Sequence, residues 1–128
     1  MLAALGMKLF ASDHLLSMSA APIIWSGHFV VCYAVVALAC ALGWTDARVL
    51  DLAVAPATVL LATLAALTLL GMSAAHNMKK IRRVRTSPSE AAEVSGFVAT
   101  AALLLCLLSG VAIMWVATPA IILPACTP

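Results

Sequence analysis

The sequence predicts an all-α integral membrane protein: three transmembrane helices, a short N-terminal interfacial helix and an apolar C-terminal tail. Composition is the first observation, because 65% of the 128 residues are hydrophobic and only 9% are charged, against about 25% charged in soluble domains. The second is that three stretches, residues 14–45, 52–78 and 94–128, contain no Asp, Glu, Lys or Arg. Each stretch is long enough to cross a bilayer, which takes about 20 apolar residues.

A basic cluster sets the expected orientation of these spans. Five of the seven basic residues fall in one short run and are Lys79, Lys80, Arg82, Arg83 and Arg85. Lys and Arg in short loops stay on the cytoplasmic side. The sequence therefore predicts a bacterial cytoplasmic (inner) membrane protein with its N-terminus in the cytoplasm and its C-terminus in the periplasm. The cluster is expected to contact anionic membrane lipid, and without interleaved aromatic residues it does not favour nucleic-acid binding.

The first element is the segment 1–20, which mixes leucines with Lys8 and Asp13. The apolar run after Lys8 is too short for a signal peptide, so we expect the segment to be retained. An interfacial helix and a disordered end are both compatible with this pattern.

Helix 1 is expected at residues 22–44. Pro22 is tolerated in a first helical turn, where its missing N–H costs little. Trp25 and Trp44 bracket the apolar run at a separation of about 28 Å in helical rise, close to the thickness of the hydrocarbon core. Tryptophans at both ends are typical of aromatic belts at the headgroup level.

Helix 2 is expected at residues 52–76, followed by a cytoplasmic basic loop at 77–88. Small alanine-rich positions in helix 2 favour close packing against a neighbouring helix, because lipid provides no hydrophobic drive between helices.

Helix 3 is expected at residues 89–118. Ser87 is the expected N-cap with Pro88 following it. Pro119 is expected to end the helix, since proline removes a backbone hydrogen bond and crowds the preceding turn. The apolar outer tail, 119–128, is expected to fold back onto the protein or to lie at the outer interface.

His28 is the conspicuous polar residue inside a span. Trp25, His28 and Cys32 fall on one helical face, which we interpret as a partner contact. Ionisable groups within a membrane usually face a protein interior or water, so haem ligation, a proton path and a hydrogen bond to a partner subunit are all candidate roles. A neutral histidine bonded to a backbone carbonyl inside the bundle is the simpler alternative.

His76 closes helix 2 and is expected at a depth similar to that of His28. Two such histidines on neighbouring helices could ligate one haem axially. His76 could equally lie in water at the headgroup level.

The cysteines are Cys32, Cys40, Cys106 and Cys126, and they form no CxxC or other metal-ligand spacing, which disfavours zinc and iron–sulfur sites. Cys40 and Cys126 are both expected at the outer side, where a periplasm would allow a disulfide. Four free cysteines are the alternative.

No catalytic constellation is visible, so we expect no enzymatic activity, no metal or cofactor of its own and no small-molecule substrate. The spans contain no Asp, Glu, Lys or Arg, which disfavours a stand-alone transporter.

Two segments carry a resemblance to a known family. The first is 21–33, with Pro22 leading to Trp25, then the His28–Phe29 pair and Cys32, followed by Ala39-Cys40-Ala41. The second is 112–126, with Trp115-x-x-x-Pro119 and a final Pro124-x-Cys126. Together they resemble small bacterial membrane proteins encoded among the genes of cytochrome c oxidase, a haem–copper terminal oxidase.

This resemblance implies an accessory subunit of the oxidase, with haem and copper residing in larger partner subunits rather than in this chain. It draws attention to Trp25, His28, Cys32 and the two outer cysteines without assigning them a mechanism. An oxidase assembly or cofactor-insertion factor is the alternative. A small haem-b electron carrier that uses His28 and His76 is a second alternative.

Overall fold

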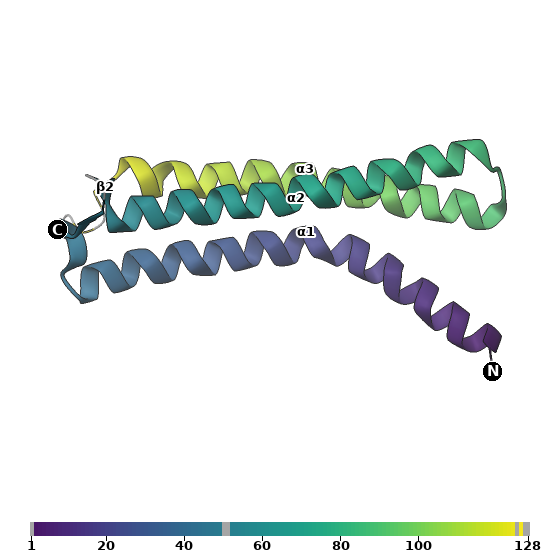
Figure 1. Ribbon diagram of the computed structural model, residues 1–128, viewed down its shortest axis with the longest axis horizontal. Coiled ribbons are helices and arrows are strands. Elements are labelled where there is room, and N and C mark those ends of the chain that lie inside the picture. The colour runs from purple at the N-terminus through teal and green to yellow at the C-terminus, as the bar shows by residue number, and fades with distance from the viewer. Residues whose placement is uncertain (1, 50–51, 125, 127–128) are drawn as a thin grey trace.

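The computed structural model describes residues 2–49, 52–124 and 126, and the side chains of 14–44, 46–48, 52–124 and 126. Its three long helices are α1 (Leu2–Ala41), α2 (Val54–Thr86) and α3 (Glu90–Ile122). They lie side by side in an elongated bundle (Figure 1). All three are long and apolar enough to span a membrane, which confirms the predicted all-α class and indicates a multi-pass membrane protein.

Helix α1 is longer than the sequence predicts. Residues 2–20, expected as a separate segment, are the first turns of α1, and Pro22 lies inside the helix. A proline inside a helix removes one backbone hydrogen bond and kinks the axis. In agreement, α1 bends, and its N-terminal half leans away from α2 and α3 (Figure 1). An interfacial position for these turns stays a prediction.

The connection between α1 and α2 has structure that the sequence does not predict. Helix α1 ends at Ala41, three residues before the expected end, because Gly43 adopts the left-handed conformation with φ 67°, which stops a helix. A 3₁₀ turn, η1 (Trp44–Asp46), follows, and then β1 (Arg48–Val49) pairs antiparallel with β2 (Leu52–Ala53).

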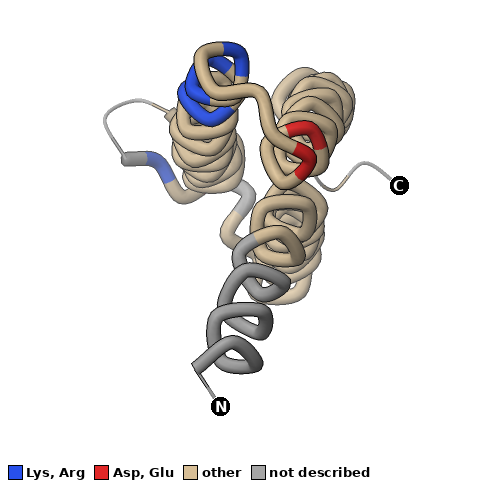
Figure 2. The backbone as a smooth tube through the Cα atoms, turned by 90° about the vertical axis from the view of Figure 1, so that its right-hand side faces the viewer, with Lys and Arg blue, Asp and Glu red and all other residues tan. Residues whose placement is uncertain are grey.

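Helix α2 continues through the basic cluster to Thr86, so the expected loop 77–88 is reduced to residues 87–89. Lys and Arg are good helix formers, and Arg83 and Arg85 in the last turn oppose the partial negative charge of the helix C-terminus. Figure 2 shows the basic residues at this end of α2 and the acidic residues at the adjoining start of α3. We call this end of the bundle the basic end.

Helix α3 begins one residue later than expected and ends four residues later. Ser89, rather than Ser87, is the N-cap: its hydroxyl accepts a hydrogen bond from the amide of Ala92 at 3.2 Å. Pro119 does not stop the helix, because it interrupts one hydrogen bond only and the next turn closes, with the Leu123 amide donating to the Pro119 carbonyl at 2.9 Å.

The core of the bundle is built largely from small side chains. One buried cluster comprises Ala21, Ala66, Leu70, Cys106 and Ile113. A second cluster, nearer the opposite end, comprises Cys32, Val59 and Ala117. Small residues let helix backbones approach closely where lipid supplies no hydrophobic drive, so the alanine-rich pattern of the sequence has a direct packing role.

Candidate functional site

His28 lies inside the bundle, with 4% of its surface exposed. Its Nε2 lies 3.0 Å from the Thr63 hydroxyl on α2. The Thr63 hydroxyl donates its own proton to the Val59 carbonyl at 2.7 Å, so it can only accept from the histidine. We therefore assign the Nε2–H tautomer, with Nδ1 free to accept.

Cys32 lies one turn along α1 from His28 and is equally buried. Its Sγ is 3.4 Å from His28 Nε2 and 3.9 Å from Nδ1. The thiol, the imidazole and the Thr63 hydroxyl thus form one buried polar site between α1 and α2. A thiol and an imidazole are both metal donors, but the described part of the chain contains no group of three or more His, Cys, Asp or Glu residues that could hold a metal ion.

The structure differs from the predicted partner contact at Trp25, His28 and Cys32. His28 and Cys32 face inward, because the polar imidazole finds its hydrogen-bond partner, Thr63, within the chain. Trp25 alone of the three is exposed, and its ring lies 6.3 Å from that of Phe29. The outward face of this stretch of α1 therefore carries Trp25 and Phe29, whereas His28 and Cys32 are turned away from it.

The structure does not bring His28 and His76 together. His28 contacts Thr63, whereas His76 is 13 residues further along α2, a helical rise of about 20 Å. His76 is exposed beside the first lysines of the basic cluster. The two histidines do not share the depth expected for them, so the structure does not place His28 and His76 as axial ligands of one haem.

A second polar network, which the sequence analysis missed, joins the three helices near the basic end. Asn77 is 1% exposed, and its Oδ1 accepts from the Ser17 hydroxyl of α1 at 2.8 Å. Its Nδ2 donates to the Ser73 carbonyl at 3.0 Å, while the Cys106 thiol of α3 donates to the Ser73 hydroxyl at 3.7 Å. The four-residue spacing of Ser73 and Asn77 places both on the inward face of α2 and was the available signal.

The opposite end of the bundle is closed covalently. Cys40, in the last turn of α1, forms a disulfide with Cys126 after α3, with 5.7 Å between their Cα atoms. Cys32 and Cys106 are free and buried. We call this the disulfide end; it also carries the short β1–β2 hairpin (Figure 1).

A groove between α1 and α3 lies on the side of the disulfide end. Its volume is about 320 Å³, and its wall comes from Phe29, Cys32 and Tyr33 on α1 and from Val116 to Pro124 of the α3 end. Tyr33 is 71% exposed beside it, and its hydroxyl has no hydrogen bond within the described residues. We refer to this surface as the α1–α3 groove.

No family model, no curated protein and no solved structure matches this chain. Its role must therefore be inferred from the chemistry of its own surfaces.

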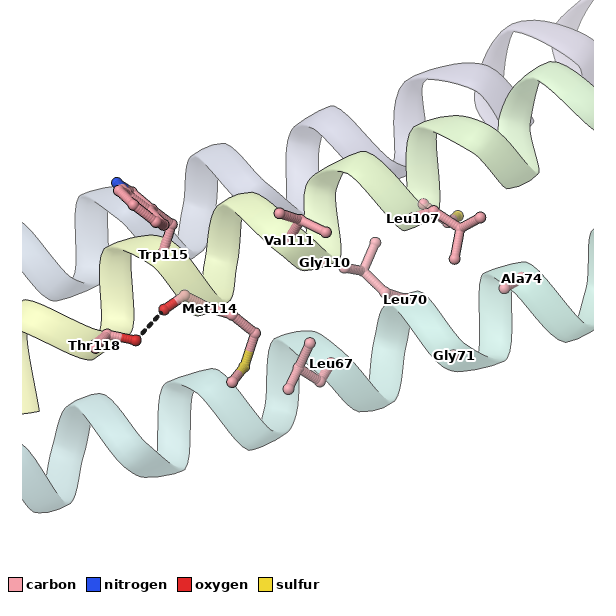
Figure 3. Close-up of a pocket in the computed structure, with 11 residues that line it drawn as sticks. Leu67, Leu70, Gly71, Ala74, Leu107, Gly110, Val111, Met114, Trp115 and Thr118 are labelled. Atoms are coloured by element: carbon pink, nitrogen blue, oxygen red, sulfur yellow. Dashed lines mark hydrogen bonds between the residues drawn. The ribbon is translucent and has the colours of Figure 1, made fainter.

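A second groove, between α2 and α3, is mostly apolar and has a volume of about 510 Å³. Figure 3 shows Gly71 and Gly110 among its lining residues, together with leucines and Met114. An added Cβ at either glycine would meet nothing within 4 Å. The Thr118 hydroxyl in its lining donates to the Met114 carbonyl at 2.7 Å, so the groove mainly offers packing space for an apolar chain.

Proposed function

We propose that this protein is a non-catalytic accessory subunit of a bacterial respiratory membrane complex, a haem–copper cytochrome c oxidase, and that it packs against the catalytic subunit. The proposal rests on the resemblance of residues 21–33 and 112–126 to proteins encoded with oxidase genes, and on one structural observation that calls for a protein partner. In this proposal the haem and copper belong to the partner subunits.

That observation is the position of Tyr33. It precedes Ala41, the last residue of α1, by eight residues, or about 12 Å of helical rise, so it lies within the part of α1 that would cross a hydrocarbon core of ~30 Å. An unsatisfied polar group in hydrocarbon costs several kcal/mol. An acceptor from a second transmembrane protein would satisfy it.

The α1–α3 groove is the surface that we assign to this partner. All of its lining residues except Val36 come from the two segments that carry the family resemblance, although these segments are far apart in the chain. The surface is apolar, exposes Phe29 and Tyr33, and faces the lipid, so it suits one transmembrane helix of a larger subunit.

Orientation in the bacterial inner membrane is part of the proposal, and two independent features support the same arrangement. Basic residues gather at one end of the bundle (Figure 2), and such residues favour the cytoplasmic side. The disulfide lies at the other end, and disulfides persist in an oxidising compartment such as the periplasm. Helix α1 then starts in the cytoplasm, and α3 ends at the periplasm.

Co-purification tests the proposal directly. The tagged chain, extracted in mild detergent, is expected to carry haem-bearing subunits at fixed stoichiometry, seen by subunit identification and a reduced-minus-oxidised haem spectrum. A gently purified oxidase that lacks the chain would contradict it. Enrichment on haem-deficient precursors, with depletion from the mature enzyme, would favour the assembly factor instead.

Substituting Tyr33→Phe tests the assigned surface. Removing one interhelical hydrogen bond in a membrane costs about 1 kcal/mol, so the partner should dissociate at a lower detergent concentration. Thr68→Val is the matched control, because this exposed hydroxyl on α2 already donates to the Leu64 carbonyl at 2.7 Å. Equal retention of the partner by the wild type and Tyr33→Phe would remove the groove from the interface.

A further inference from the structure

We propose that the basic end of the bundle contains a binding site for the phosphate group of an anionic phospholipid, in a cavity between α1 and α2 beside Lys80. The cavity has a volume of about 510 Å³ and is lined by Leu16, Ser17 and Ala20 of α1 and by Ser73, His76, Asn77 and Lys80 of α2. The site is independent of the partner proposed above.

Its depth suits a lipid headgroup. Residues 52–78 contain no Asp, Glu, Lys or Arg, and the charged run starts at Lys79. The cavity therefore spans the last uncharged turn of α2 and the first charged one, where hydrocarbon gives way to headgroups. Basic pockets between transmembrane helices at this level are suited to anionic headgroups.

The Lys80 charge has no acidic partner among the residues whose side chains the structure describes, 14–44, 46–48, 52–124 and 126. Lys80 is half-buried, yet within the described part of the chain it forms no ion pair, and no acidic residue lines the cavity. The acidic residues near this end, Glu90 and Glu93, belong to the first turn of α3, which contributes nothing to the lining. A lysine beside the exposed His76 supplies donors of the kind that phosphate oxygens accept.

The cavity is preformed by the Asn77 network. The bond from Ser17 to Asn77 Oδ1 at 2.8 Å holds α1 against α2 at the cavity wall, and the bond from Asn77 Nδ2 to the Ser73 carbonyl fixes the amide. Asn77 therefore fixes the separation of the two helices before any ligand binds. A preformed site loses little conformational freedom on binding.

A phosphate ester could arrive as a lipid or as a soluble ion, and the apolar part of the lining favours the lipid. Leu16 is 64% exposed beside the cavity, and Ala20 continues the same wall toward the hydrocarbon. These side chains would contact the glycerol unit and the first methylenes of an acyl chain, which a free phosphate lacks.

The test is a lipid titration of the full chain in neutral detergent, read by native mass spectrometry. Phosphatidylglycerol should bind more tightly than phosphatidylcholine with the same acyl chains. Lys80→Gln should weaken phosphatidylglycerol binding about fivefold, the effect of one basic residue near an anionic headgroup. Lys79→Gln is the matched control, because Lys79 is adjacent, exposed and outside the cavity lining, and it should change the affinity by less than twofold.

Equal losses in the two lysine variants would mean diffuse attraction rather than a site and would overturn the proposal, as would equal binding of the two lipids. Ala20→Leu fills the cavity without changing charge and should also remove the preference for phosphatidylglycerol, in a chain whose helical circular dichroism is retained. A preference that survives this substitution counts against the cavity. Displacement of phosphatidylglycerol by millimolar inorganic phosphate would assign the site to a soluble ion.

Discussion

Three buried polar side chains, those of His28, Thr63 and Asn77, are each paired with another group of the protein, as a membrane interior requires. Lipid offers no hydrogen bonds, so a polar side chain between transmembrane helices needs an acceptor or donor from its own chain or from a partner. His28 has Thr63, Asn77 has Ser17 and the Ser73 carbonyl, and exposed threonines such as Thr68 bond to the backbone one turn earlier. Tyr33 is exposed and forms no hydrogen bond within the described residues, and for that reason we assign it to the proposed partner contact.

Replacing Thr63 with valine should destabilise the bundle by about 1–2 kcal/mol. Valine keeps the shape but leaves the His28 N–H buried without its acceptor. The measurement is the free energy of unfolding in SDS titrated against neutral detergent. Thr63→Ser keeps the acceptor and should stay close to the wild type, and Thr68→Val serves as the control for loss of an exposed hydroxyl. A Thr63→Val protein as stable as Thr68→Val would contradict the assigned hydrogen bond.

At the scale of the element, the positions at which the helices end depend on local backbone conformation more than on hydrophobicity. Gly43 ends α1 through its left-handed conformation, whereas the charged residues after Met78 do not end α2 at all. The tight α2–α3 connection then depends on Ser89, whose hydroxyl satisfies one of the free amides at the start of α3.

Ser89→Ala should cost about 1 kcal/mol in helix stability and loosen the first turn of α3. Amide hydrogen exchange over residues 90–93 should become about fivefold faster. Ser87→Ala is the matched control, because the Ser87 side chain makes no hydrogen bond within the described residues. Equal exchange rates in both variants would show that Ser89 is not the functional cap.

The sequence predicts the elements well where physical chemistry is local and poorly where it depends on neighbours. The three spans follow from the stretches of sequence without charged residues. The four-residue spacing of Ser73 and Asn77 also places both residues on one face of α2, where the Asn77 amide bonds to the Ser73 carbonyl. The β1–β2 hairpin, with two residues in each strand, is too short for an alternating pattern. The partner of His28 was missed because one helix cannot reveal which face of α2 will oppose it.

At the scale of the whole molecule, the bundle has two chemically different ends. One gathers the basic residues, and the other holds the disulfide and the hairpin (Figures 1 and 2). The clustering of basic residues in the sequence predicts the basic end, since charged side chains are rarely accommodated in hydrocarbon. The Cys40–Cys126 disulfide at the other end was one of two interpretations that the sequence left open. Whether these cysteines pair depends on the path of the tail after Pro119, and a tail of ten residues can take many paths.

Thiol labelling should report this asymmetry. In membranes denatured with SDS without reductant, a maleimide reagent is expected to add to two cysteines, Cys32 and Cys106, and after reduction to all four. Mass spectrometry gives the count. Four modifications without reductant would show that the bridge is absent from the cellular protein. Cys106→Ala, which should lower the unreduced count to one, controls for incomplete labelling.

The disulfide also has a consequence for biogenesis. Cys40 lies in the last turn of the first span and Cys126 follows the third, with a sequence separation of 86 residues, so the bond encloses α2 and α3 in a covalent ring. Because Cys126 reaches the far side only after α3 has crossed, the ring cannot close on a chain that is truncated or partly inserted. Formation of the Cys40–Cys126 disulfide therefore indicates that all three helices have been inserted into the membrane.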